Sequence, residues 1–121
     1  MIPKTNRLKK NKQFSYIYKH GQTKHTSFLS LSFVKTKFKP YKVGFTVSKK
    51  IGKSVIRSKV KRRLREAFRS LMPNVNENYN YIIIARPEIA SASFDEIKSS
   101  IISVLKKSGL WLDGNNLDEN V

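Results

Sequence analysis

The spacing of apolar residues near the N-terminus predicts a helix over residues 11–19. Phe14, Ile17 and Tyr18 stand at positions i, i+3 and i+4, so they share one helical face. Asn11 is a residue type that commonly caps a helix N-terminus, and Gly21 lies just beyond the predicted end.

Residues 26–35 and 42–48 alternate apolar and polar positions, the period of a half-buried strand. In the first segment one face carries Leu29, Leu31 and Phe33, and the other carries Phe28, Ser30 and Ser32. In the second segment one face carries Val43, Phe45 and Val47, and the other carries Gly44, Thr46 and Ser48. The sequence FKPYK between them turns the chain. We therefore expect the two strands to form an antiparallel pair.

A longer helix is predicted from about Ser54, its expected N-cap, to Leu71, before Pro73 stops it. Its apolar residues fall on one stripe: Ile56, Val60, Leu64, Ala67, Phe68 and Leu71. The apolar run YNYIIIA at residues 79–85 predicts a strand, and helical spacing returns over residues 95–107.

The predicted order is α-β-β-α-β-α, with room for one more short strand beside the pair. This order predicts a single α+β domain over residues 1–107, in which helices pack on a small sheet. Residues 108–121 are polar and acidic, so we expect a flexible C-terminal tail.

The basic residues are concentrated in the first half of the chain. Residues 1–65 contain 20 Lys and Arg and no Asp or Glu, whereas residues 66–121 contain 5 basic and 8 acidic residues. Ten of the basic residues fall in the 22 positions from Ser48 to Arg69. An ordinary solvated helix face interleaves acids with bases, and this segment holds only Glu66. A polyphosphate partner accounts for such a surface, because each neutralised phosphate releases counterions.

Other site types find little support in the sequence. The triplet Gly52-Lys53-Ser54 lacks the earlier glycine of a phosphate-binding loop, because Val47 occupies that position. His20 and His25 have no companions at metal-ligand spacing, and no catalytic constellation can be placed. Without cysteines, disulfides are excluded. Without a long apolar run, neither a signal peptide nor a membrane span is supported, so we expect a cytoplasmic protein.

The predicted sheet has a face of small and hydroxyl side chains with aromatic residues at its margin. Phe28 shares this face with Ser30 and Ser32 by the alternation count, and the neighbouring strand adds Thr46 and Ser48. Such a face suits a shallow groove for unpaired nucleotides, with aromatic rings to stack on bases and basic rims for the backbone.

Three stretches together resemble the bacterial ribonuclease P protein component family. They are NRLKKNKQF…YKHG, VGFTVSKKIGKSVIRSKVKRRLREAFR and YIIIAR, and the similarity runs from about Asn6 to Lys107. The chain departs from the family at Ser58, where asparagine is usual. It also departs at Leu31, where an aromatic is frequent but the alternation count places the side chain in the core.

The resemblance implies an α-β-β-β-α-β-α sandwich with a left-handed β-α-β crossover. It also implies two partners, the catalytic RNA of ribonuclease P and precursor tRNA. That RNA uses Mg²⁺ to hydrolyse a phosphodiester and release the 5′ leader. The protein is implied to assist as an accessory subunit without catalytic residues of its own, and the sequence assigns it no metal ligands or cofactor. No membrane and no obligate protein partner are implied.

The resemblance also assigns residues to the two partners. For the catalytic RNA it implies a set on the basic helix and its start: Lys53, Arg57, Ser58, Lys61, Arg62, Arg65 and Arg69. For the leader it implies aromatic, hydroxyl and basic side chains around the groove: Phe14, Tyr18, Phe28, Thr46, Ser48, Lys49, Lys50 and Arg86.

Two alternatives remain open from the residues alone. The same surface would serve a general RNA-binding or ribosome-associated module. The second alternative is a membrane-surface or nucleoid-type basic protein. A membrane-surface helix leaves an apolar face free for lipid, whereas the apolar stripe of the predicted helix over residues 54–71 is needed by the core.

Overall fold

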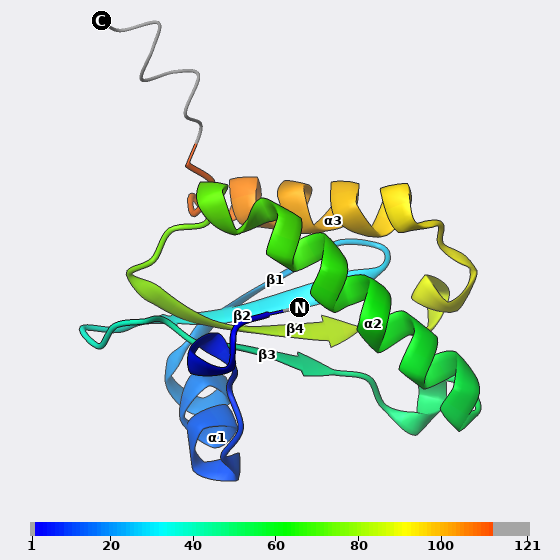
Figure 1. The fold of residues 1–121 in the computed structure, drawn as a ribbon, viewed down its shortest axis with the longest axis horizontal. Helices are drawn as coiled ribbons and strands as arrows, with labels where there is room; N and C mark the ends of the chain where they lie inside the picture. Colours follow the sequence, from blue (N-terminus) through cyan, green and yellow to red (C-terminus); the bar gives the residue numbers. More distant parts are fainter. Residues whose placement is uncertain (1, 113–121) are drawn as a thin grey trace, which may run out of the picture.

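A mixed sheet covered by helices on both faces is the architecture of residues 2–112, the part of the chain described by this computed structural model (Figure 1). The helices are α1 (Asn11–His20), α2 (Ser54–Leu71) and α3 (Phe94–Lys107), and the strands are β1 (Gln22–His25), β2 (Leu29–Lys35), β3 (Val43–Thr46) and β4 (Tyr79–Ala85). Short 3-10 turns are η1 (Lys4–Asn6), η2 (Lys49–Ile51), η3 (Met72–Asn74) and η4 (Pro87–Ser91). The predicted α+β class and the α-β-β-β-α-β-α order are confirmed.

The sheet order is β1-β2-β4-β3, so the predicted antiparallel pairing of residues 26–35 with residues 42–48 is wrong. β4 lies between them, antiparallel to β2 and parallel to β3. The reason lies in the side chains of β4: Tyr81 and Ile83 are fully buried on one face and Ile82 is fully buried on the other. A strand that is apolar on both faces is most stable in the centre of a sheet.

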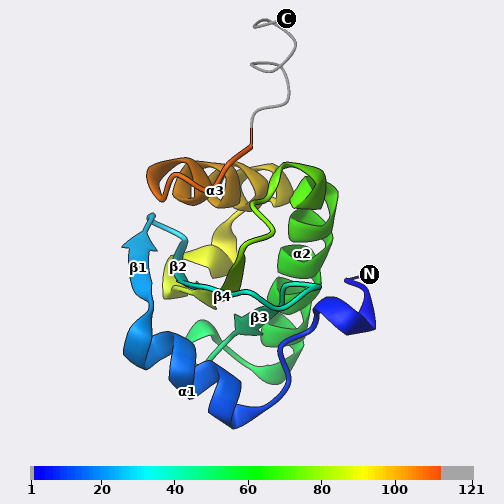
Figure 2. The same cartoon turned by 90° about the vertical axis from the view of Figure 1, so that its left-hand side faces the viewer.

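The chain passes from β3 through α2 to the parallel strand β4. Viewed with both strands running away, this connection turns left-handed (Figures 1 and 2), as the resemblance implied. Most such crossovers are right-handed, so physical rules alone would have given the opposite hand. The path places α2 beside the edge strand β3, on the face opposite α1.

β1 is a strand whose residues are all exposed, and its sequence QTKH therefore shows no hydrophobic alternation. It pairs with β2, where Thr23 Oγ1 lies 2.9 Å from Ser32 Oγ and His25 Nδ1 lies 2.7 Å from Ser30 Oγ. Ser30 and Ser32 are consequently buried and hydrogen-bonded. The hydroxyl face expected to be open on β2 is closed.

Two hydrophobic clusters hold the layers together. The larger one joins the sheet to α2 and α3 and includes Leu31, which confirms its predicted core position. The α2 stripe is buried as predicted from Val60 to Leu71, but Ile56 is 39% exposed, close to Gly52 at the start of the helix. The smaller cluster joins α1 to the sheet through Leu8, Ile17 and Ile82.

Each helix begins and ends within one residue of its predicted bounds. α1 begins at Asn11 with Lys10 as its N-cap, and α2 begins at Ser54 with Lys53 as its N-cap, so neither predicted cap is the cap residue. α1 ends at His20, and the N–H of the following residue, Gly21, donates to the Ile17 carbonyl at 2.7 Å. A Cβ on Gly21 would lie 2.5 Å from the Phe33 carbonyl oxygen, which only glycine avoids.

The packed chain continues past residue 107, where the predicted tail begins. Trp111 bridges to Val75, and the Asn76 N–H donates to the Leu110 carbonyl at 3.0 Å. Leu110 is buried. Residues 113–121 of the predicted tail lie outside the described residues. Within residues 2–112, no helix combines the length and apolar character needed to span a bilayer.

Candidate nucleic-acid interface

α2 carries a row of basic side chains along the flank that lies beside β3. Arg57, Lys61, Arg65 and Arg69 repeat every four residues, a spacing that brings side chains onto one flank and makes like charges repel. Lys53, Arg62 and Ser58 of the predicted RNA-binding set are exposed beside this row. In the region from residue 2 to residue 112, neither an acid nor a carbonyl pairs with Lys53, Lys61, Arg62, Arg65 or Arg69. Lys61, Arg65 and Arg69 of the row are therefore free to meet an external anion, whereas Arg57 Nε already donates to a backbone carbonyl.

A glycine turn sets the start of this helix. Gly52 has φ of +148°, a conformation that other residues rarely adopt, and its carbonyl accepts from Arg57 Nε at 3.2 Å. Lys49 and Lys50, in the turn η2 just before, are exposed. On the opposite flank of α2 the basic side chain is bonded within the protein. Arg63 Nη1 donates to the Ala92 carbonyl, just after η4, at 3.2 Å.

Phe14 of α1 reaches the same region from the other side of the sheet. Its ring rests on Gly44 of β3 so closely that a Cβ on Gly44 would lie 2.6 Å from the ring's Cζ. Beside this contact is a hollow of about 360 Å³ that passes the edge of β3. Phe14 lines it together with Lys61 and Arg65 of α2. The predicted aromatic site and the predicted basic helix are thus neighbours.

Arg7 and Lys9 line the same hollow, and neither was among the predicted site residues. Leu8 between them donates its N–H to the Val43 carbonyl at 3.0 Å, which fixes this segment along the edge of β3. The basic run NRLKKNK indicated a positively charged segment. Its residues could not be assigned to the site from the sequence, because nothing in the sequence shows that residues 7–8 lie beside β3.

Tyr18 lies one turn beyond Phe14 and reaches the far end of β3. Its hydroxyl is 3.3 Å from Thr46 Oγ1, although Tyr18 is 49% exposed. Thr46 leads directly through the exposed Ser48 to the lysines of η2. Four of the predicted leader-binding positions, Tyr18, Thr46, Ser48 and Lys49, are therefore contiguous.

Arg86 follows β4 at the end of the sheet where η2 packs against η4. Its side chain is half-buried because Nη1 donates to the Thr26 carbonyl at 3.2 Å. The guanidinium is committed in part to the β1–β2 turn, whereas within residues 2–112 no partner binds the side chains of Lys49 and Lys50.

Phe28 is placed elsewhere, and the alternation prediction is wrong for it. It lies in the turn before β2 and packs against the larger cluster, on the side of α3. There it borders a different hollow with Asp95 and Glu96. The strand begins only at Leu29, so the period that relates Ser30 and Ser32 does not extend back to Phe28.

The side chains on these surfaces are basic, aromatic and hydroxyl-bearing. Among residues 2–112, no three His, Asp or Glu side chains gather closely enough to hold a metal ion. Burial raises the pKa of Tyr41 and Tyr81 above the ordinary phenol value, but both side chains belong to the core, away from the basic row. The arrangement can neutralise phosphates and stack on bases.

Comparisons with known proteins agree on one family. The family model described as Ribonuclease P matches residues 2–109. The ribonuclease P protein component of Caldanaerobacter subterraneus subsp. tengcongensis is 40% identical over 111 residues, which cover 92% of this chain and 96% of the relative. That of Alkaliphilus oremlandii is 43% identical over 105 residues, covering 87% and 92% respectively.

Solved structures extend the similarity to the fold. The RNase P protein of Staphylococcus aureus superposes with a TM-score of 0.82 at 31% identity, covering 89% of this chain and 99% of that one. The RNase P protein of Thermotoga maritima superposes with a TM-score of 0.76 at 25% identity, covering 84% and 96%.

Proposed function

Because the chain belongs to the ribonuclease P protein component family, we propose that it binds the catalytic RNA of ribonuclease P on α2 and the 5′ leader of precursor tRNA on the adjoining surface of α1 and β3. Membership makes it the protein component of a ribonuclease in tRNA processing. The division into two RNA surfaces is our proposal, and it rests on one observation. Phe14 and the pair Lys61 and Arg65 line a single hollow.

The basic row of α2 is the proposed docking surface for the catalytic RNA. Arg57, Lys61, Arg65 and Arg69 span about 18 Å along the helix at ~1.5 Å per residue, enough for several backbone phosphates. Arginine binds phosphate oxygens bidentately, and each neutralised phosphate releases counterions. Lys53, Ser58 and Arg62 extend this surface around the helix. Ser58 supplies one hydroxyl where an asparagine would supply an amide.

The leader is proposed to lie along α1 and β3. Phe14 and Tyr18 offer aromatic rings, Thr46 and Ser48 offer hydroxyls, and Lys49, Lys50 and Arg86 offer positive charge. Unpaired RNA is commonly bound by stacking on aromatic side chains beside a basic groove. We leave Phe28 out of this site, because it packs on the side of α3.

The protein contributes binding and charge, and the RNA carries the chemistry in this proposal. Mg²⁺ is the metal implied for the RNA, and the described residues include no group of three or more His, Asp or Glu side chains that could hold a metal ion. Two polyanions, catalytic RNA and precursor tRNA, must approach each other closely. The cations that line the shared hollow reduce their mutual repulsion.

The apolar stripe of α2 argues against a membrane-surface role. Val60, Leu64 and Phe68 of the stripe are buried against the sheet and α3, so only Val55 and Ile56 at the start of this helix leave apolar surface exposed.

Reconstitution tests the proposal. The protein is added to ribonuclease P RNA with precursor tRNA at a Mg²⁺ concentration too low for the RNA alone, and 5′ leader release is measured. We expect cleavage to be restored. No stimulation at any Mg²⁺ concentration, despite binding to RNA, would instead support a general RNA-binding or ribosome-associated module. Binding to anionic vesicles without preference for RNA would support the membrane-surface alternative.

A further inference from the structure

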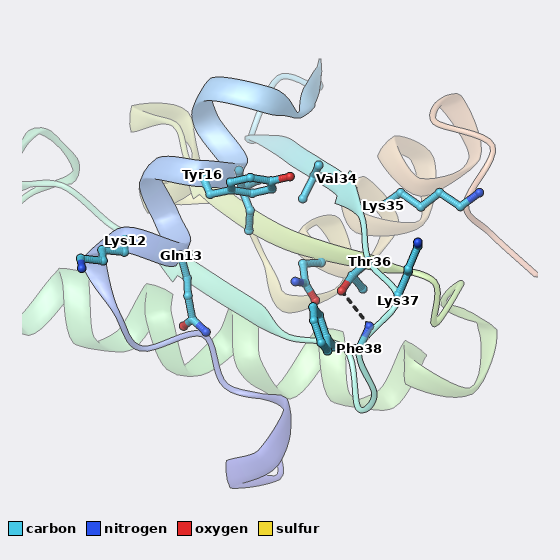
Figure 3. Close-up of a pocket in the computed structure, with 10 residues that line it drawn as sticks. Lys12, Gln13, Tyr16, Val34, Lys35, Thr36, Lys37 and Phe38 are labelled. Carbon is cyan, nitrogen blue, oxygen red and sulfur yellow. Dashed lines mark hydrogen bonds between the residues drawn. The ribbon is translucent and has the colours of Figure 1, made fainter.

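α1 has a second flank that the proposed leader site does not use. With about 100° between successive residues of a helix, Phe14 and Tyr18 project to one side of the buried Ile17, and Gln13 and Tyr16 project to the other. The second flank borders a separate hollow of about 480 Å³ (Figure 3). Its opposite wall is the end of β2 and the following turn, Val34–Phe38, and Asn80 of β4 also lines it. This volume lies within the usual range of ligand sites, about 300–1,000 Å³.

The charge around this hollow is entirely positive. Lys12 stands on the α1 rim, and Lys35 and Lys37 stand on the β2 rim (Figure 3). All three are exposed, no acid lines the hollow, and within residues 2–112 no carboxylate or carbonyl pairs with them. Three unpaired cations around one depression favour an anionic ligand with charge on more than one side.

Two aromatic rings are exposed at the same place. Tyr16 is 56% exposed and Phe38 is 83% exposed. The Phe38 backbone is held by the Thr36 side chain, whose Oγ1 accepts from the Phe38 N–H at 3.1 Å (Figure 3). Exposed rings beside lysines are what a nucleobase and its phosphate require.

Two amides complete the wall with hydrogen-bond donors. The Asn80 Oδ1 already accepts from the Lys42 N–H at 2.8 Å, and the Gln13 Oε1 accepts from the Lys10 N–H at 3.3 Å. With their oxygens engaged, both side chains keep an NH₂ group that can donate to base or sugar oxygens.

We propose that this hollow binds an unpaired nucleotide of RNA, with its base against Tyr16 or Phe38 and its flanking phosphates near Lys12, Lys35 and Lys37. Cations on both rims fit a strand that passes through better than a free mononucleotide. The inference rests on the proposed function, because the RNA is that of the ribonuclease P complex. The nucleotide comes either from the catalytic RNA or from a distal part of the leader, and the chemistry is the same for both.

A single cysteine tests the site directly, because the native chain has none. Phe38→Cys is coupled to a benzophenone, and the labelled protein is irradiated with catalytic RNA alone or with added precursor tRNA. We expect crosslinks to discrete unpaired nucleotides, and the arm in which they occur identifies their source. Lys106→Cys, exposed on α3, is the control for non-specific reaction. Crosslinking at position 38 no greater than at position 106, in both arms, overturns the proposal.

Tyr18→Cys with the same label separates this inference from the proposed function. If position 18 reacts with the leader and position 38 reacts with no RNA, only the second site is wrong. If position 18 also fails to react with the leader, the proposed leader surface is wrong as well.

Two double variants test whether the lysines on the β2 rim contribute to RNA binding. Lys35→Ala/Lys37→Ala should lower the salt dependence of RNA binding, reducing the slope of log K against log salt by about 1.4 if both contact single-stranded phosphates. Lys98→Ala/Lys106→Ala on α3 removes the same charge elsewhere. Equal changes in slope for the two double variants contradict a specific site.

Discussion

Phe14 of α1 and Arg65 of α2 line one hollow, although their helices pack on opposite faces of the sheet. They share this hollow because it passes the edge of β3, where Gly44 lets the Phe14 ring lie directly on the backbone. A ring suited to stacking and a guanidinium suited to phosphate therefore meet at one place. The proposed cooperation of two RNA surfaces depends on this relationship.

Arg65→Ala should weaken binding to the catalytic RNA without unfolding the protein, because Arg65 is exposed. Loss of one charge-assisted contact corresponds to about tenfold or more in affinity, since such hydrogen bonds contribute about 1.5–3 kcal/mol. The salt slope should fall by about 0.9 for a phosphate of duplex RNA, by analogy with DNA. Binding titrations over a range of salt measure both. Lys106→Ala is the control, and an unchanged slope for Arg65→Ala would contradict phosphate contact.

Phe14→Ala should reduce affinity for precursor tRNA and leave affinity for mature tRNA unchanged, because only the precursor carries a leader. Stacking on one aromatic is worth about 1–3 kcal/mol, or roughly 5- to 150-fold. Gly44→Ala provides a second route to the same loss, because its Cβ would displace the Phe14 ring. Both variants are checked for folding by circular dichroism. Equal losses for both tRNAs in folded variants would rule out a leader role.

Gly21→Ala should lower the free energy of unfolding by about 1–3 kcal/mol through overpacking. The new Cβ would lie 2.5 Å and 2.6 Å from the carbonyl oxygens of Phe33 and Ile17, which are backbone atoms that cannot move aside easily. Gly109→Ala is the comparison, since its Cβ meets nothing within 4 Å and only the φ of +74° is unfavourable. Chemical denaturation should show the larger loss at position 21; a smaller loss there than at position 109 would contradict the close approach.

Tyr41 and Tyr81 should resist ionisation until the protein unfolds. Burial raises the pKa of both above the ordinary value of ~10. The folded pKa exceeds the unfolded one, so their contribution to stability is complete below about pH 10 and declines as the pH rises above it. Phenolate absorbance during alkaline titration should reveal these two of the five tyrosines only together with unfolding. Titration of all five with the fold intact would disagree with their burial.

Much of the fold follows from periodicity. α3, α2 and β4 were predicted within one residue of their bounds, because their apolar positions match helix or strand periods and each must be buried. β1 was not predicted from periodicity, because its sequence QTKH is exposed along its whole length. Hydroxyl and imidazole contacts to β2 hold it in place. Strand order was also missed: nothing in residues 42–48 shows that β4 lies between that segment and β2.

The candidate site was predictable in composition but not in shape. The basic row of α2 follows from spacing alone, because i, i+4 residues share a flank. The closure of the β2 hydroxyl face could not be foreseen without β1, and the misplaced Phe28 came from extending a strand period into a turn. Arg7 and Lys9 could not be predicted as site residues, because they line the hollow through the hydrogen bond between Leu8 and Val43. That bond joins segments far apart in the sequence.

A radical probe at Lys9 can show whether the two RNA surfaces meet, because Lys9 is exposed and lines the hollow shared by Phe14 and Arg65. Iron–EDTA is tethered to Lys9→Cys in the complex of protein, catalytic RNA and precursor tRNA, and local hydroxyl-radical cuts are mapped on both RNAs. We expect cuts in the catalytic RNA and in the 5′ leader from this one position. Cuts in only one of the two RNAs, with both bound, would contradict it.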